Sequence, residues 1–204
     1  MLVLTSSASL KSVRTPSRTA PAGVPTGGGG LPTELVRLRD GSSVTIRPAT
    51  TEDEPALRSF LSGMCLEARR MRFFTEAASM RIAAHLVAVV DQSHYGLVAH
   101  DETGTVVAHA IYVQLDAARA EVGVEVADHL HGCGLGTILV DRLAASAERR
   151  GITTFVAEVL CENGEMLDVF RDGFDARVVR QEGPEETVEF PTASWRLSRE
   201  RFGS

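Results

Sequence analysis

Three glycines alternate with other residues in the run His-Gly-Cys-Gly-Leu-Gly-Thr at positions 131–137, between a strand-like and a helix-like segment. Residues 119–126 form the strand-like segment, and residues 138–150 carry apolar side chains at helical spacing. Backbone N–H groups at a helix start lack partners within the helix and carry partial positive charge. Glycine has no Cβ and leaves them open to a close ligand. The order strand, glycine-rich turn, helix therefore predicts a seat for a pyrophosphate.

Two common nucleotide-binding signatures do not fit this run. A Walker loop needs Lys-Ser/Thr after its last glycine, but Leu135 follows Gly134 and Thr137 follows Gly136. The dinucleotide signature Gly-x-Gly-x-x-Gly fails because its third glycine would fall on Thr137 or Leu139. Glu158 does lie near the spacing of a ribose-binding carboxylate, so a dinucleotide-binding reductase stays as a distant alternative.

The run resembles the signature Gln/Arg-x-x-Gly-x-Gly/Ala of the GNAT superfamily of acyl-CoA-dependent N-acetyltransferases, with His131 where arginine or glutamine is usual. Residues 162–174 are similar to the family's Asn-x-x-Ala/Met-x-x-x-Tyr/Phe-x-x-x-Gly-Phe helix, and residues 44–53 to its first strand and helix cap. The resemblance covers about residues 43–191. Within the superfamily the chain resembles bacterial Pat-type protein lysine acetyltransferases, through Arg-Phe-Phe at 72–74 and Asp128-x-x-His131-Gly132.

Composition excludes several other classes of protein. The net charge of −6 argues against general nucleic-acid binding, which usually needs a basic surplus. Cys65, Cys133 and Cys161 are neither a disulfide framework nor metal ligands by their spacing, so a reducing cytoplasm is the expected location. Nothing approaches the apolar length of a membrane span.

The chain divides into a tail and one domain. Residues 1–33 contain no acidic residue and are rich in Ser, Thr, Pro and Gly, which predicts a disordered tail or a start codon placed too early, ahead of an organelle transit peptide. Residues 34–204 are long enough for a single domain with its own core.

The segment order predicts a mixed α/β fold. We expect a hairpin around Asp40-Gly41, a capping box formed by Thr51 and Glu54, and helix-terminating glycines at Gly151 and Gly173. The resemblance implies a central, mostly antiparallel sheet, splayed between the fourth and fifth strands, with helices on both faces. The predicted strands cover residues 35–38, 43–47, 95–99, 105–113, 119–126, 153–159, 174–181 and 186–190, and the predicted helices 51–64, 76–90, 135–150 and 163–172.

The resemblance also assigns the chemistry of acyl transfer. The backbone amide of Val124, with Val126 beside it, would stabilise charge on the thioester oxygen. Glu121 occupies the family's usual position for the base that deprotonates the amine. Glu125 shares its strand face and is a second candidate, since a carboxylate in a half-dry cleft can have a raised pKa. The alternative is that this face lies at an exposed sheet edge and both are surface carboxylates.

Further residues follow from the same resemblance. Arg72, Phe73 and Phe74 precede the second helix, where the family builds its acceptor site; a solvated helix face with buried phenylalanines is the alternative. Asn163 is either a contact to the cofactor arm or a helix N-cap. Phe170 replaces the tyrosine that often protonates the leaving thiolate, and packing is its other explanation. His129 and His131 lack a third metal ligand nearby. The expected cofactor contacts are Val124, Val126, His131, Gly132, Cys133, Gly134, Leu135, Gly136, Thr137, Asn163 and Phe170.

The resulting hypothesis is an N-acetyltransferase that moves acetyl from acetyl-CoA to an amine, foremost a protein lysine, by direct transfer with a glutamate base. No metal, nucleic acid or membrane is expected as a partner, and the fold allows a homodimer. A small-molecule amine is the nearest alternative acceptor. A non-catalytic acyl-CoA-binding regulatory module is the alternative of a different class, kept open by Phe170 and His131 at the two unusual positions.

Overall fold

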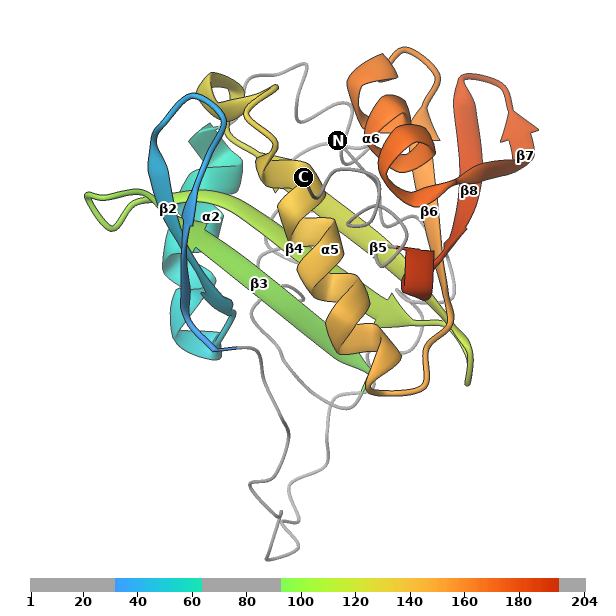
Figure 1. Cartoon of the computed structure of the whole chain (residues 1–204), viewed down its shortest axis with the longest axis horizontal. Coiled ribbons are helices and arrows are strands. Elements are labelled where there is room, and N and C mark those ends of the chain that lie inside the picture. The colour runs from blue at the N-terminus through green and yellow to red at the C-terminus, as the bar shows by residue number, and fades with distance from the viewer. Residues whose placement is uncertain (1–31, 64–92, 195–204) are drawn as a thin grey trace, which may run out of the picture.

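The computed structural model describes residues 32–63 and 93–194 (Figure 1). Most of the predicted tail, the helix predicted at 76–90 and the candidate acceptor residues Arg72, Phe73 and Phe74 lie outside the described residues. Within the described segments, no helix combines the length and the apolar composition needed to cross a membrane.

A single eight-stranded sheet forms the frame, in the order β1-β2-β3-β4-β5-β6-β8-β7. Neighbouring strands are antiparallel except β5 and β6, which are parallel, so the mostly antiparallel mixed sheet is confirmed. The strands are β1 (Glu34–Arg37), β2 (Ser43–Pro48), β3 (His94–His100), β4 (Val106–Gln114), β5 (Arg119–Val126), β6 (Thr154–Leu160), β7 (Arg177–Glu182) and β8 (Glu185–Pro191).

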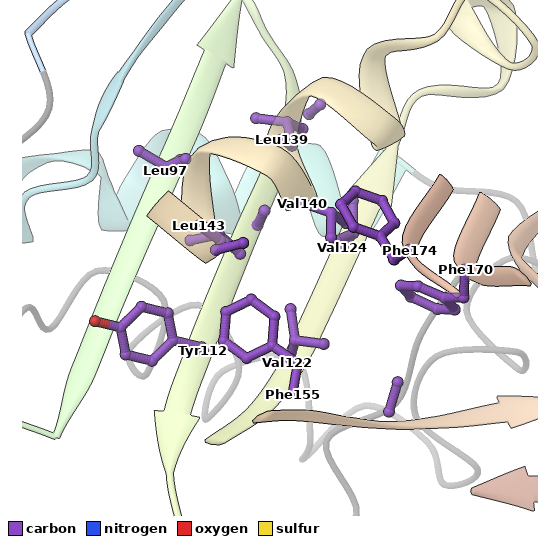
Figure 2. Packing of buried hydrophobic residues seen from close by; sticks show 14 of the residues in the cluster. Leu97, Tyr112, Val122, Val124, Leu139, Val140, Leu143, Phe155, Phe170 and Phe174 are labelled. Atoms are coloured by element: carbon purple, nitrogen blue, oxygen red, sulfur yellow. The ribbon is translucent and has the colours of Figure 1, made fainter. Parts of the chain in front are cut away.

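Helices cover both faces of the sheet (Figure 1). Helix α2 (Glu54–Gly63) buries Leu57 against one face. Helices α5 (Leu135–Glu148) and α6 (Gly164–Phe174) pack on the other, where Leu139 and Leu143 of α5 belong to one buried cluster with Tyr112 and the valines of β5 (Figure 2). Three short 3₁₀ turns complete the described segments: η1 (Thr51–Asp53), η2 (Asp128–Leu130) and η3 (Thr192–Ser194).

Alternation along β5 sorts its side chains between these two layers. Val122 and Val124 belong to the core beneath α5 and α6. Because successive strand residues point to opposite faces, Glu121, Gly123 and Glu125 lie on the α2 side. This shared face is what the sequence predicted for the two glutamates.

Strands β5 and β6 pair over only a short length. Their register runs Arg119↔Thr154, Ala120↔Phe155 and Glu121↔Val156 and stops there among the described residues. Beyond it, β5 continues to Val126 while β6 continues beside β8. The predicted splay is therefore present, but between the fifth and sixth strands of this chain, because β1 precedes the strands that the family signature counts.

The helix cap before α2 lies one residue earlier than predicted. The N–H of Thr50, not Thr51, bonds the carboxylate of Asp53 at 2.8 Å. Asp53 is further held by Arg47, with an Nη2–Oδ1 separation of 2.6 Å. Burial acts to raise the pKa of Asp53, but the hydrogen bonds and charge from Arg47, with the Thr50 N–H, outweigh it and lower the pKa. The guanidinium of Arg47 thus holds Asp53 as the capping acid.

The end of α6 also differs from the prediction. Gly173 lies inside the helix, and Asp175 ends it in the left-handed conformation, with φ 54°. Aspartate tolerates this conformation better than most residues. Phe174 stays helical because its ring packs against Phe190. Strand β7 consequently begins at Arg177 rather than at 174.

Candidate active site

The glycine run makes a turn that ends at the start of α5. Gly132 and Gly134 have φ values of 72° and 87°, in the left-handed region that glycine adopts without strain. Gly134 is the N-cap and supplies no side chain to cover the helix end. The first bond of the helix runs from the N–H of Ile138 to the carbonyl of Gly134, at 3.1 Å. The amides of Leu135, Gly136 and Thr137 therefore precede the helical ladder, as an anion seat requires.

Strand β5 turns alternate backbone groups away from β4. The N–H of Ala127 bonds the carbonyl of Val107 at 2.8 Å, which places the odd-numbered residues of this ladder in hydrogen-bonded pairs with β4. The N–H groups of Val124 and Val126 consequently point toward the β6 side. Both residues lie beyond Glu121, where registered pairing with β6 has ended. This orientation fits the predicted use of both amides as donors to a ligand.

His131 is held by protein groups on three sides. Its Nε2 lies 3.1 Å from the carbonyl oxygen of Val126, and because a carbonyl only accepts, Nε2 is the donor. The ring is also 4.0 Å from a carboxylate oxygen of Asp128 and 3.8 Å from one of Glu165. The Nε2 donor of His131 thus ties the loop to the end of β5, and the phosphate contact of this residue stays a prediction. No cluster of three potential metal ligands occurs in the described part of the chain.

Cys133 contributes its backbone rather than its thiol. Its carbonyl accepts the N–H of Arg39 at 3.2 Å, which joins the β1–β2 hairpin to the glycine loop. Desolvation, and then the nearby carboxylate of Asp40, raise the pKa of the Cys133 thiol. A protonated thiol is a poor nucleophile, so nothing here indicates a covalent role.

Glu121 lies where β5 and β6 part. It is 3% exposed, and its neighbours across the sheet are Val113 in β4 and Val156 in β6. A carboxylate enclosed by two valine-bearing strands is not a surface residue, so the alternative of an exposed sheet edge is wrong. It belongs to the last registered pair before the two strands diverge.

Glu125 is engaged with His109, the residue directly opposite in β4. Both side chains are fully buried, and Oε2 of Glu125 lies 2.6 Å from Nε2 of His109. The two atoms lie within ion-pairing distance, although their orientation is not that of an aligned hydrogen bond. The ring of Phe60 in α2 meets the imidazole edge-on, with centroids 6.1 Å apart. Glu125 therefore has a structural partner that the sequence did not reveal.

Replacing Glu125 with alanine should lower the free energy of unfolding. Glu125→Ala leaves His109 buried without its carboxylate, and breaking a buried pair in this way costs about 3 kcal/mol of unfolding free energy. Urea denaturation followed by circular dichroism measures it, with Glu102→Ala in an exposed turn as the control. The double variant His109→Leu/Glu125→Leu should lose less than Glu125→Ala alone. A loss below about 1 kcal/mol for Glu125→Ala would contradict the pairing.

Asn163 and Phe170 are the described candidates on α6. The side chain of Asn163 accepts the N–H of Met166 at 3.3 Å, so its predicted N-cap role is confirmed. Phe170 is fully buried and stacks on Phe190, with ring centroids 4.8 Å apart. This supports packing for Phe170 over the predicted contact with a cofactor.

Glu158 has a setting unlike that of a dinucleotide site. Burial, and then the charge of Glu185, raise its pKa, while Arg180 opposes the rise. It lies on β6 beyond the point where β5 and β6 separate. The sheet around it is mostly antiparallel, whereas a dinucleotide-binding fold is built on a mostly parallel sheet.

Arg39 lies beside the glycine loop, a position that the sequence analysis did not predict. It follows β1 in the hairpin that bonds Cys133, and its Nε lies 3.3 Å from the place where a Cβ on Gly134 would stand. The hairpin itself was predicted, but its contact spans about a hundred residues of chain and has no local signal.

Comparisons with known proteins agree with this geometry. A family model described as "Acetyltransferase (GNAT) family" matches residues 61–174. The crystal structure of the GNAT domain of S. lividans PAT shares 31% identity, with a TM-score of 0.69, and the match covers 78% of this chain and 96% of that one.

Two more distant structures share the fold. A cAMP-binding acyltransferase from Mycobacterium smegmatis shares 24% identity, with a TM-score of 0.58, and the match covers 81% of this chain and 48% of that one. Spermidine N-acetyltransferase from Vibrio cholerae, in complex with CoA and spermine, shares 13% identity, with a TM-score of 0.56, over 75% of this chain and 98% of that one.

Proposed function

Because the chain belongs to the GNAT acetyltransferase family, we propose that it transfers the acetyl group of acetyl-CoA to the side-chain amine of a protein lysine. The observation that carries the proposal is the orientation of β5: the amides of Val124 and Val126 face away from β4, between buried Glu121 and the open N-terminus of α5. In this proposal Glu121 is the base, the amide of Val124 is the oxyanion donor, and the start of α5 beyond the same strand is the anion seat.

The residues fit the parts of acetyl-CoA in order. The amides at the start of α5 suit its diphosphate, since helix N-termini favour anions. The pantetheine arm would lie along β5 toward Glu121, taking hydrogen bonds from the amides of Val126 and Val124. This places the thioester carbonyl at the N–H of Val124, a donor that is fixed before the reaction begins.

The role proposed for Glu121 follows from the proton that the acceptor amine must lose. A lysine ammonium must lose a proton before its nitrogen can attack the carbonyl carbon, and Glu121 accepts that proton. Glu121 and Val124 are three residues apart, about 10 Å along a strand, so the proton passes through a water molecule between amine and carboxylate. As the new C–N bond forms, the nitrogen releases its second proton to solvent, the C–S bond breaks and CoA leaves as a thiolate. Its protonation comes from water, because Phe170 has no acidic proton.

The protein acceptor is favoured by the likeness to the S. lividans PAT domain, which this chain matches over nearly that domain's full length. A polyamine is the second candidate. It is favoured by Glu158, whose surroundings on the C-terminal strands include the charges of Glu182 and Glu185, countered by one arginine, Arg180. Such an acidic setting suits an acceptor with several positive charges.

The decisive assay is release of free CoA thiol from acetyl-CoA in the presence of a panel of lysine-containing proteins, polyamines and other small amines. We expect release with a protein acceptor, and mass spectrometry should find an added 42 Da on a lysine, as expected for one acetyl group added. Release only with polyamines would mean that the acceptor is a polyamine and not a protein lysine. Binding of acetyl-CoA with no release in any condition would leave a non-catalytic acyl-CoA-binding module and sink the proposal.

A further inference from the structure

The glycine loop lacks a cation of its own. Between Arg119 and Arg142 the sequence contains no lysine or arginine, although this stretch includes the whole loop and the first turn of α5. The partial charge of a helix N-terminus is about half a unit, less than the charge of a diphosphate. The ring of His131 lies beside the carboxylates of Asp128 and Glu165 and is hydrogen-bonded to the carbonyl oxygen of Val126. A cation from elsewhere in the fold would complete the seat.

Arg39 is positioned to be that cation. Its backbone N–H is anchored on the carbonyl of Cys133 at 3.2 Å. Its side chain passes the N-cap residue of α5, with Nε 3.3 Å and Cζ 3.7 Å from the Cβ position of Gly134. A side chain on Gly134 would therefore meet the guanidinium directly.

The guanidinium of Arg39 is not committed to a carboxylate within the described residues. The adjacent Asp40 turns its Oδ1 to the N–H and hydroxyl of Ser42 instead. Other arginines nearby are paired: Arg47 with Asp53, and Arg142 with Glu34. Arg39 is also exposed, so its donors can reach a ligand without breaking an internal contact.

We propose that Arg39 is a ligand of the diphosphate of coenzyme A, supplied by the β1–β2 hairpin across the N-terminus of α5. The proposal rests on the proposed function, because it needs coenzyme A in this seat. The diphosphate is chosen over the 3′-phosphate because the guanidinium lies against Gly134, next to the amides that precede the helical ladder. A guanidinium can donate two parallel hydrogen bonds to a phosphate, which the backbone amides alone do not supply.

The test is calorimetric binding of CoA and of dephospho-CoA, which keeps the diphosphate but lacks the 3′-phosphate. Arg39→Gln should weaken both about tenfold, the loss expected for one charged hydrogen-bonding group. The salt dependence of the dissociation constant should become shallower. The affinity of Arg39→Lys for each ligand should lie between those of Arg39→Gln and the unmodified protein. The control is Arg37→Gln, an exposed arginine on the same hairpin, which should bind like the unmodified protein.

The outcomes separate this inference from the wider proposal. If the unmodified protein binds CoA and Arg39→Gln binds it equally well, the inference fails while the proposed function stands. A loss for CoA but not for dephospho-CoA would assign Arg39 to the 3′-phosphate and overturn the diphosphate contact. If the unmodified protein binds neither ligand, the proposed function itself fails. Should Arg39→Gln not fold, Arg39→Lys decides, since it keeps the charge but loses the forked donor.

Discussion

Glu121→Gln should lower the turnover number about a hundredfold or more at neutral pH, the usual contribution of a general base. The amide cannot accept a proton, so the variant depends on the small fraction of acceptor that is already uncharged. That fraction grows with pH, because an unperturbed lysine has a pKa of about 10.4. The residual rate should therefore rise toward alkaline pH and narrow the gap to the unmodified enzyme. Thiol release measured across pH 6–10 checks this, at saturating acetyl-CoA.

Binding of acetyl-CoA is the control for this variant. Glu121 faces the α2 side, whereas the amides that would hold the cofactor lie in the plane of the sheet, so the dissociation constant should stay within about twofold of the unmodified value. Glu158→Gln provides a matched loss of charge on the next strand. If Glu158→Gln abolishes turnover and Glu121→Gln does not, the base has been assigned to the wrong glutamate.

Gly134→Ala should weaken CoA binding more than tenfold and should also destabilise the fold. Alanine in the left-handed conformation, at φ 87°, costs about 1–2 kcal/mol of unfolding free energy. The loss of binding has a separate cause, because its Cβ would stand 3.3 Å from Nε of Arg39 beside the start of α5, where the phosphate would bind. Calorimetry with CoA measures the loss of binding, and urea denaturation measures the cost to folding.

Gly104→Ala is the control that divides the two effects. Gly104 also has a positive φ, 83°, but lies in the turn between β3 and β4 with no atom within 4 Å of its Cβ position. Gly104→Ala should lose about as much unfolding free energy as Gly134→Ala and keep full affinity for CoA. If both alanine variants bind CoA like the unmodified protein, the glycine turn shapes the backbone but does not contribute to CoA binding.

Local sequence patterns predicted most of the strands, helices and turns. Alternating apolar residues located β5 at the observed bounds, and the glycine run located the start of α5, because both signals lie within a few neighbouring residues. The hairpin at Asp40-Gly41 was predictable for the same reason: Gly41 takes the left-handed conformation that such a turn needs. These features depend on backbone preference and on burial of one face.

Contacts between distant segments were beyond the same reasoning. Pairing of Glu125 with His109 depends on the register of β5 against β4, and a shift of one residue would have put His109 on the other face. The approach of Arg39 to Gly134 depends on how the hairpin folds over the loop. The acceptor residues Arg72, Phe73 and Phe74 remain predictions, since they lie outside the described segments.

The three residue pairs that join β5 to β6 are the whole of their registered pairing among the described residues. On one side of them lie β1 to β5, and on the other β6, β8 and β7, and each half of the sheet has its own hydrogen-bond ladder. Side chains also join the two halves, among them Phe155 of β6 against Tyr112 of β4. The width of the opening therefore depends on this packing rather than on either ladder.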